Sequence, residues 1–194
     1  MLRGVLVSVV AAGSALAGLA LGATPAMAVA APTNVVVPGT AGGDGHGGTP
    51  PVATRIVLGS NGAVVVTATG TVYLSALDVF GGLPNGPNGG NSTGSNPAGP
   101  GALVPSSPYG CLVARVGTGD WRCIGAGPTL LSGTGEVMLA VNDGLFGAGG
   151  VPGYADNSGQ FAVTMVEGSI YPPDLPLRTT ATLGSHHHHH HHHR

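Results

Sequence analysis

The chain has 194 residues, and glycine and proline, with 36 and 16 residues, make up roughly a quarter of it. Only 7% of the residues are charged, far below the ~25% that is typical of soluble domains, and the positive charges are six arginines without a lysine. Binding of nucleic acid depends on positive side chains that neutralise phosphates. Because the chain has so few of them, we expect no nucleic-acid partner.

Both ends of the chain have features of targeting or purification segments, which are not part of a folded domain. Residues 1–28 start with a short basic segment, continue as an apolar run and end in Ala26-Met27-Ala28, which predicts a cleaved secretory signal peptide; a transmembrane anchor is the alternative. Residues 171–183 are predicted to be a C-terminal extension and residues 184–194 a histidine-rich purification tag. We therefore expect a secreted or cell-surface protein whose mature chain has no membrane span, with four arginines, eight acidic residues and a net charge of −4.

In chain order, residues 29–54 are predicted to be an N-terminal arm or linker, in which Val35–Val37 is either a strand or a pendant arm and a flexible loop follows. The folded domain is predicted to span residues 55–170. Its first strands, Arg55–Leu58 and Ala63–Ala68, are separated by a turn with an Asn-Gly dipeptide, which is the strongest short signal for a β-hairpin.

The middle of the chain is predicted to hold one long loop between extended segments. Thr71–Val79 is predicted to be extended, and residues 81–108 form a Gly-, Pro- and Asn-rich loop, which at this length is either functional or mobile. Beyond it, Leu112–Val116 and Trp121–Ile124 alternate apolar and polar residues around a Gly-rich turn, which predicts a hairpin with one buried face.

The last two predicted strands are Glu136–Val141 and Gln160–Val166. No segment of the mature chain has the 3.6-residue apolar period of a helix over even three turns. Short strands, closely spaced turn signals and the lack of a predicted helix together predict an all-β fold, a small antiparallel β-sandwich.

The chain has two cysteines, Cys111 and Cys123, which flank the predicted hairpin. An exported protein permits disulfides, so we expect the two to pair. Because the enclosed loop is short, chain entropy gives such a bond roughly 2 to 3 kcal/mol of stabilisation.

The sequence lacks the motifs of common catalytic sites. His46 is the only histidine outside the tag, and there is no Gly-x-Ser-x-Gly elbow, no phosphate-binding loop and no Cys/His metal cluster. We therefore expect no enzymatic activity, while a glycosidase that uses paired carboxylates stays formally open.

Polar residues gather at the ends of two predicted strands. Asn142 and Asp143 end one strand, and Asp156 and Asn157 precede the next. If these strands are neighbours, the four side chains meet at one edge of the sandwich, where carboxylate and amide oxygens are the ligands that calcium requires. The same residue types also form turns, because their side chains cap backbone groups. On composition alone, both interpretations stay open.

The segments GCLVARVG, EVMLAVND and YADNSGQFAVTM, between Gly110 and Met165, resemble the C-terminal half of the PA-I galactophilic lectins, a family of calcium-dependent bacterial lectins. The resemblance implies a jelly-roll sandwich in which a calcium ion chelates two sugar hydroxyls. The calcium ligands it implies are the side chains of Asp143, Asp156 and Asn157, and the carbonyls of Gly153 and of Leu74 or Tyr73.

The resemblance also implies a carbohydrate partner, galactose-like in the family, that contacts Asn142, Asp143 and Asn157. Tyr109 and Tyr154 flank this site and either bond the ligand or anchor loops. The loop 144–152 is several residues longer than in the lectins and lies where the sugar is expected. Trp121 is either a platform on which a sugar ring stacks or a packing residue.

Together these features predict a secreted, non-catalytic, calcium-dependent carbohydrate-binding protein. The alternative is a structural or interaction protein of the cell envelope or of a surface filament. In that alternative the sandwich is a scaffold, and the N-terminal arm or the Gly-, Pro- and Asn-rich loops contact neighbouring subunits. Addition of the arm as a strand to a neighbouring subunit would build a homo-oligomer.

Overall fold

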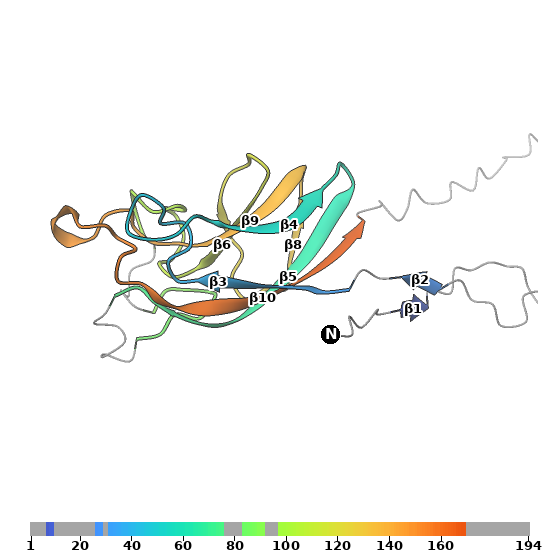
Figure 1. The fold of residues 1–194 in the computed structure, drawn as a ribbon, viewed down its shortest axis with the longest axis horizontal. Coiled ribbons are helices and arrows are strands. Elements are labelled where there is room, and N and C mark those ends of the chain that lie inside the picture. Colours follow the sequence, from blue (N-terminus) through green and yellow to red (C-terminus); the bar gives the residue numbers. More distant parts are fainter. Residues whose placement is uncertain (1–6, 10–25, 29–30, 76–82, 92–96, 170–194) are drawn as a thin grey trace, which may run out of the picture.

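The computed structural model describes residues 7–9, 26–28, 31–75, 83–91 and 97–169 (Figure 1). The predicted C-terminal extension and tag lie outside the described residues, as does most of the predicted signal peptide. Within the latter, strands β1 (Val7–Val9) and β2 (Ala26–Ala28) pair with each other in an antiparallel ribbon. Among the described residues, no helix has the length and apolar character needed to cross a membrane.

Two four-stranded antiparallel sheets form a β-sandwich, which confirms the predicted fold class (Figure 1). One sheet has the order β3-β10-β5-β8 and the other the order β4-β9-β6-β7. The strands are β3 (Thr33–Pro38), β4 (Val52–Leu58), β5 (Gly62–Tyr73), β6 (Leu112–Val116), β7 (Arg122–Cys123), β8 (Thr129–Ser132), β9 (Gly135–Val141) and β10 (Ser158–Ser169). The helical part of the described chain is a single 3-10 turn, η1 (Ala148–Gly150).

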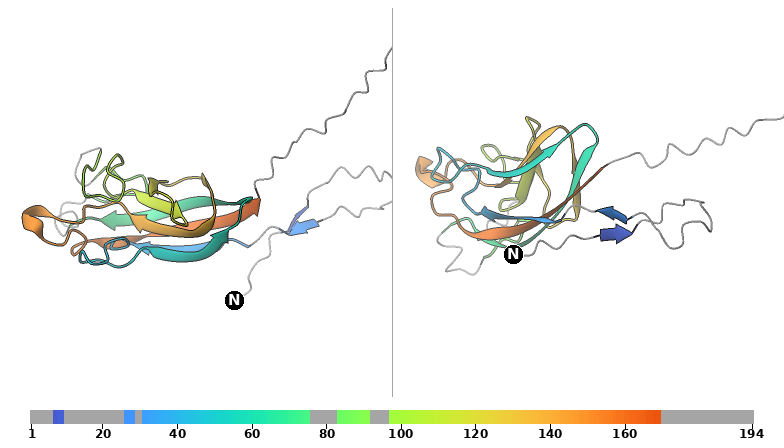
Figure 2. Two further views of the ribbon diagram at one scale, coloured as in Figure 1. Left: turned by 90° about the horizontal axis from the view of Figure 1, so that it is seen from above. Right: turned by 45° about the vertical axis from the view of Figure 1, so that its right-hand side comes forward.

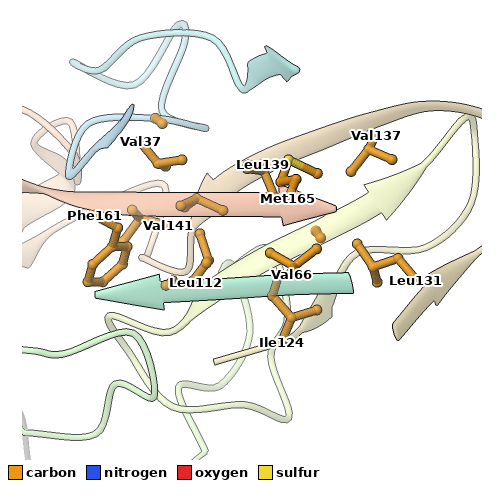
Figure 3. Close-up of a cluster of buried hydrophobic side chains, with 14 of the residues drawn as sticks. Val37, Val66, Leu112, Ile124, Leu131, Val137, Leu139, Val141, Phe161 and Met165 are labelled. Carbon is orange, nitrogen blue, oxygen red and sulfur yellow. The ribbon is translucent and has the colours of Figure 1, made fainter. Parts of the chain in front are cut away.

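The core lies between the two sheets and follows from the alternation of side chains along each strand. In β4, for example, Thr54, Ile56 and Leu58 are buried while the residues between them are exposed. Fully burying an aliphatic side chain of this size stabilises a fold by about 1.5 to 3 kcal/mol. Figure 3 shows the apolar side chains that meet between the layers, among them Val37, Val66, Leu112, Leu139, Phe161 and Met165.

The predicted hairpin around the Asn-Gly turn is wrong. β4 pairs with β9 and β5 pairs with β10 and β8, so the turn after Leu58 carries the chain from one sheet to the other. Both strands have one apolar face, and they bury these faces against each other across the core instead of pairing side by side. A local turn signal does not distinguish these two arrangements, because each needs a sharp reversal of the chain.

Of the two alternatives for Val35–Val37, the structure has the strand and not the pendant arm, because the described part of residues 29–54 belongs to the sandwich. β3 pairs with β10 along its whole length, and Val37, opposite Phe161, is fully buried. The following loop, residues 39–50, packs against the ring of Tyr154, where glycines make the close approach possible. A Cβ atom at Gly43 would overlap that ring. The folded domain therefore starts at β3 and not at residue 55.

The second half of the chain agrees better with the predicted strands. β6 and β7 form the predicted hairpin, with Val113 opposite Cys123. The predicted disulfide is confirmed, and it joins Cys111 to Cys123 with 6.0 Å between their Cα atoms. Strand β8 was not predicted, and the first part of the extended segment predicted at 71–79 is the end of β5.

Candidate functional site

The two polar pairs predicted to meet do so at one end of the sandwich, but not for the predicted reason. β9 and β10 are not neighbours, because they lie in different sheets. Asp143 follows β9 and Asn157 precedes β10 at the same end of the two layers, and the Asn157 Nδ2 atom donates a hydrogen bond to Asp143 Oδ2 at 2.8 Å. The site therefore bridges the two sheets.

Asn157 has an unusual hydrogen-bonding state for a buried side chain. It is 8% exposed, and its Nδ2 atom donates to both Asp143 Oδ2 and Gly39 O, the latter at 2.9 Å. These two acceptors define the orientation of the amide, since a flipped amide would place its oxygen against two other oxygens. The Oδ1 atom is buried and has no hydrogen-bond partner among the described residues. An acceptor left in this state costs about 1 to 3 kcal/mol unless a cation or water satisfies it.

Asp143 supplies a carboxylate that contacts the nitrogen of the same amide group. Its side chain is 8% exposed, and Oδ1 accepts a hydrogen bond from the backbone N–H of Gly144 at 2.7 Å while Oδ2 accepts from Asn157. Both contacts favour the charged carboxylate and hold its plane in one orientation. Asp143 therefore presents a positioned carboxylate at the sheet-to-sheet bridge.

A pocket of about 600 Å³ opens at this end of the sandwich. The predicted ligands Asp143, Gly153, Asp156 and Leu74 line it, together with Tyr109. Neither Asn157 nor Tyr73, the alternative to Leu74, is among the lining residues, and Asn157 reaches the site through its contact with Asp143. No group of three or more His, Cys, Asp or Glu side chains suited to a metal ion occurs in the described part of the chain. A cation here would therefore need amide and backbone carbonyl oxygens as well as carboxylates.

Asn142, predicted to contact a ligand, lies instead in the interior and holds a loop. Its side chain is fully buried, its Oδ1 accepts from Val104 N at 2.9 Å, and its Nδ2 donates to the carbonyls of Val104, Ser107 and Pro108. Every polar atom of the side chain thus has a backbone partner. Asn142 supports the wall of the site from behind.

Tyr154 also has a supporting position, in agreement with the loop-anchoring alternative. The side chain is fully buried, and its hydroxyl donates to Val141 O at 2.7 Å and accepts from Asp143 N at 3.2 Å. Burial raises the pKa of Tyr154 well above its ordinary value, and the negative charge of Asp143 raises it further. The phenol therefore stays protonated and ties the end of β9 to the loop that carries the site.

The loop 144–152 forms one wall of the pocket and carries an aromatic side chain that the sequence interpretation missed. Phe146 and Val151 both line the pocket although they are 66% and 56% exposed. The ring of His46 lies edge-on to Phe146, with 5.0 Å between the centroids. Trp121 takes the packing role of its two alternatives: it lies in the β6–β7 hairpin beneath the guanidinium of Arg115, packs against a small apolar cluster that includes Val104, and does not line this pocket. The unusual length of the loop was the available signal for Phe146.

The fold and the site define an antiparallel β-sandwich with an oxygen-rich pocket at one end. No protein-family model matches the chain, and no curated protein matches it. A similar solved structure is described as "EclA N-terminal domain; PllA-like lectin"; it is 17% identical, and the match covers 72% of this chain and 98% of that chain with a TM-score of 0.48. A likeness of this size does not transfer a function between the two chains.

Proposed function

We propose that this protein is a secreted, non-catalytic carbohydrate-binding protein whose pocket holds a calcium ion that the carbohydrate also contacts. The observation that carries the proposal is the buried, unpartnered Oδ1 atom of Asn157, whose amide nitrogen donates a hydrogen bond to the carboxylate of Asp143. An unsatisfied amide oxygen on a residue that contacts a carboxylate suits a cation, because both oxygen types are cation ligands.

The proposed calcium ligands are side-chain oxygens and backbone carbonyl oxygens. Calcium takes six to eight oxygens from carboxylates, amides, backbone carbonyls and water. In this proposal Asp143, Asp156 and Asn157 contribute side-chain oxygens, and Gly153 and Leu74 contribute backbone carbonyls. The two carboxylates balance the charge of the ion. Such a set leaves coordination positions open on the pocket side, and a bound calcium ion would supply a positive centre there for two neighbouring sugar hydroxyls.

The size of the pocket agrees with a small carbohydrate. Ligand sites of small molecules have volumes of about 300 to 1,000 Å³, and the pocket has about 600 Å³. A galactose-like pyranoside is the first ligand class to test. A binding role without catalysis is favoured because both Asp143 oxygens already accept hydrogen bonds that hold the carboxylate in place.

The alternative role in a filament is less favoured as far as it uses the N-terminal arm. β3 already occupies the edge of its own sheet and buries Val37 there. Strand exchange between subunits would therefore require β3 to leave its own domain first, which costs the burial that it provides.

Thermal unfolding of the mature, tag-free protein in calcium and then in a chelator tests the proposal. A ligand that binds only the native state contributes RT ln(1 + [L]/Kd), so we expect calcium to raise the melting temperature by several degrees. The double variant Asp143→Ala/Asp156→Ala is expected to lose this rise. The matched control removes two acidic side chains that do not line the pocket, Asp120→Ala/Glu167→Ala, and is expected to keep it.

Two results would count against the proposal. If calcium leaves the melting temperature of the wild-type protein unchanged, the pocket holds no calcium. If the pocket variant responds to calcium as the wild type does, calcium binds elsewhere and the assigned ligands are wrong.

A further inference from the structure

We infer that Phe146 is a specificity-determining residue that stacks against the C–H face of the pyranose ring bound in the pocket. The inference rests on the proposed function, because it needs a carbohydrate held by the oxygen donors around Asp143. The inference adds an apolar wall, contributed by the loop 144–152, to the wall of oxygen donors around Asp143.

Phe146 is an exposed apolar side chain that lines the pocket. Large apolar side chains that face solvent lose the stabilisation that burial would give, and Val57 and Leu130 are other examples on this molecule. Those two do not line the pocket, whereas Phe146 and Val151 lie next to each other along its wall. The apolar surface of this loop is therefore continuous with the candidate calcium site.

The loop holds the ring in a defined place before any ligand arrives. Gly147 N donates to Val151 O at 2.8 Å and Gly153 N donates to Leu145 O at 2.9 Å, which closes a small hairpin. The hairpin is joined to a second loop, because Leu145 N donates to Gly101 O at 3.0 Å. The perpendicular contact with His46 further limits the ring. A preorganised platform costs little entropy when the ligand binds.

A pyranose ring has the two kinds of surface that this pocket offers. Its hydroxyls lie mainly around the rim of the ring and suit a cation and carboxylates, whereas its faces carry C–H groups that pack against an aromatic ring. An acyclic polyol such as sorbitol has neighbouring hydroxyls but no ring face. Phe146 therefore favours cyclic sugars over open-chain polyols, and among pyranosides it favours those with an uninterrupted C–H face.

Isothermal titration in calcium with methyl galactoside, methyl glucoside, methyl mannoside and sorbitol tests the inference. For the pyranoside that the wild type binds best, Phe146→Ala is expected to weaken binding about tenfold, which corresponds to the upper range for an aromatic contact. Phe146→Tyr keeps the ring and is expected to bind within about twofold of the wild type. Val57→Ala, which removes an equally exposed apolar side chain elsewhere, is expected to change nothing.

The calcium-dependent rise in melting temperature is measured on the same variants and separates the two proposals. The inference is supported if Phe146→Ala keeps this rise and loses sugar affinity. It is overturned, with the proposed function intact, if Phe146→Ala binds the sugar as tightly as the wild type or if Phe146→Tyr binds as weakly as Phe146→Ala. If the wild type binds none of the pyranosides in calcium, the proposed carbohydrate function fails, and the inference fails with it.

Discussion

Asn142 and Asn157 are two buried asparagines at the same end of the sandwich, and they differ in how their amide groups are used. The Asn142 oxygen accepts one backbone hydrogen bond, and its nitrogen donates to three carbonyls of the loop 104–108. The Asn157 nitrogen has two acceptors, whereas its oxygen has no partner among the described residues.

In the proposed function, this difference separates a residue that supports the site from one that binds the ion. A fully satisfied buried amide contributes to stability through all of its bonds, so nothing is left for a ligand. A buried amide with one unsatisfied atom lowers stability, so a fold that retains it is expected to do so where a bound ligand or water supplies the missing partner. The neighbouring residues Asn142 and Asp143 also differ, because Asn142 bonds to the loop 104–108 whereas Asp143 lines the pocket.

The largest effect is expected from Asn142→Ala. The substitution removes four hydrogen bonds and leaves Val104 N and three buried or half-buried carbonyls without their partner, so we expect a loss of about 3 kcal/mol in the free energy of unfolding. Denaturant unfolding in calcium and in chelator measures it. The loss is expected to be equal in both conditions, and a loss confined to the calcium condition would place Asn142 among the ligands.

Tyr154→Phe is expected to cost about 2 kcal/mol at neutral pH, because the hydroxyl joins Val141 O to Asp143 N in the interior. The pKa of this phenol is raised by burial, so above pH 10 the unfolded chain releases a proton that the native chain retains. Wild-type stability therefore falls as pH rises above 10, by up to about 1.4 kcal/mol per pH unit. Tyr154→Phe lacks this contribution, so the gap between the two proteins is expected to narrow from pH 10 to 11. A constant gap would show that the phenol titrates normally.

The smallest effect on intrinsic stability is expected from Asn157→Ala in chelator. Two hydrogen bonds are lost, which leaves Asp143 Oδ2 and Gly39 O without this donor, but the unsatisfied oxygen is removed as well, so we expect a net cost of about 1.5 kcal/mol. In calcium the variant is expected to show little of the wild-type rise in melting temperature. If Asn157→Ala is as destabilising in chelator as Asn142→Ala, the contrast between the two asparagines is wrong.

Much of the fold could be predicted because apolar alternation is a local property. The strands around Leu112–Val116, Glu136–Val141 and Gln160–Val166 followed from such patterns. The disulfide followed from the presence of two cysteines in a chain with an expected export signal. The assignment of strands to sheets did not follow. β4 and β5 are joined by a short turn, and only the packing of the whole core decides whether they pair side by side or face each other.

The candidate site was predictable to the same limited degree. Asp143 and Asn157 were selected from residue type and from their places at strand ends, and the structure brings them into contact. The burial of Asn142 depends on the loop 104–108 folding over it, which no local pattern encodes. Phe146 was missed because an aromatic residue in a Gly-rich loop has no periodic neighbours, so its exposure beside the pocket appears only in three dimensions.

The antiparallel pairing of β3 with β10 also determines how this molecule can be attached to something else. At the start of β3, Thr33 lies opposite Met165. Just past the end of β3, Gly39 O accepts a hydrogen bond from Asn157, next to the pocket. The chain thus enters and leaves the sandwich at the end away from the loop 144–152, as Figure 2 shows. Strand β10 has 12 residues, so its two ends, one near the pocket and one at the opposite end of the sandwich, are about 40 Å apart. A fusion partner, a sensor chip or a cell surface joined directly before β3 or directly after β10 would therefore leave the pocket facing outward. Several copies attached side by side in this way would present their pockets to the same target.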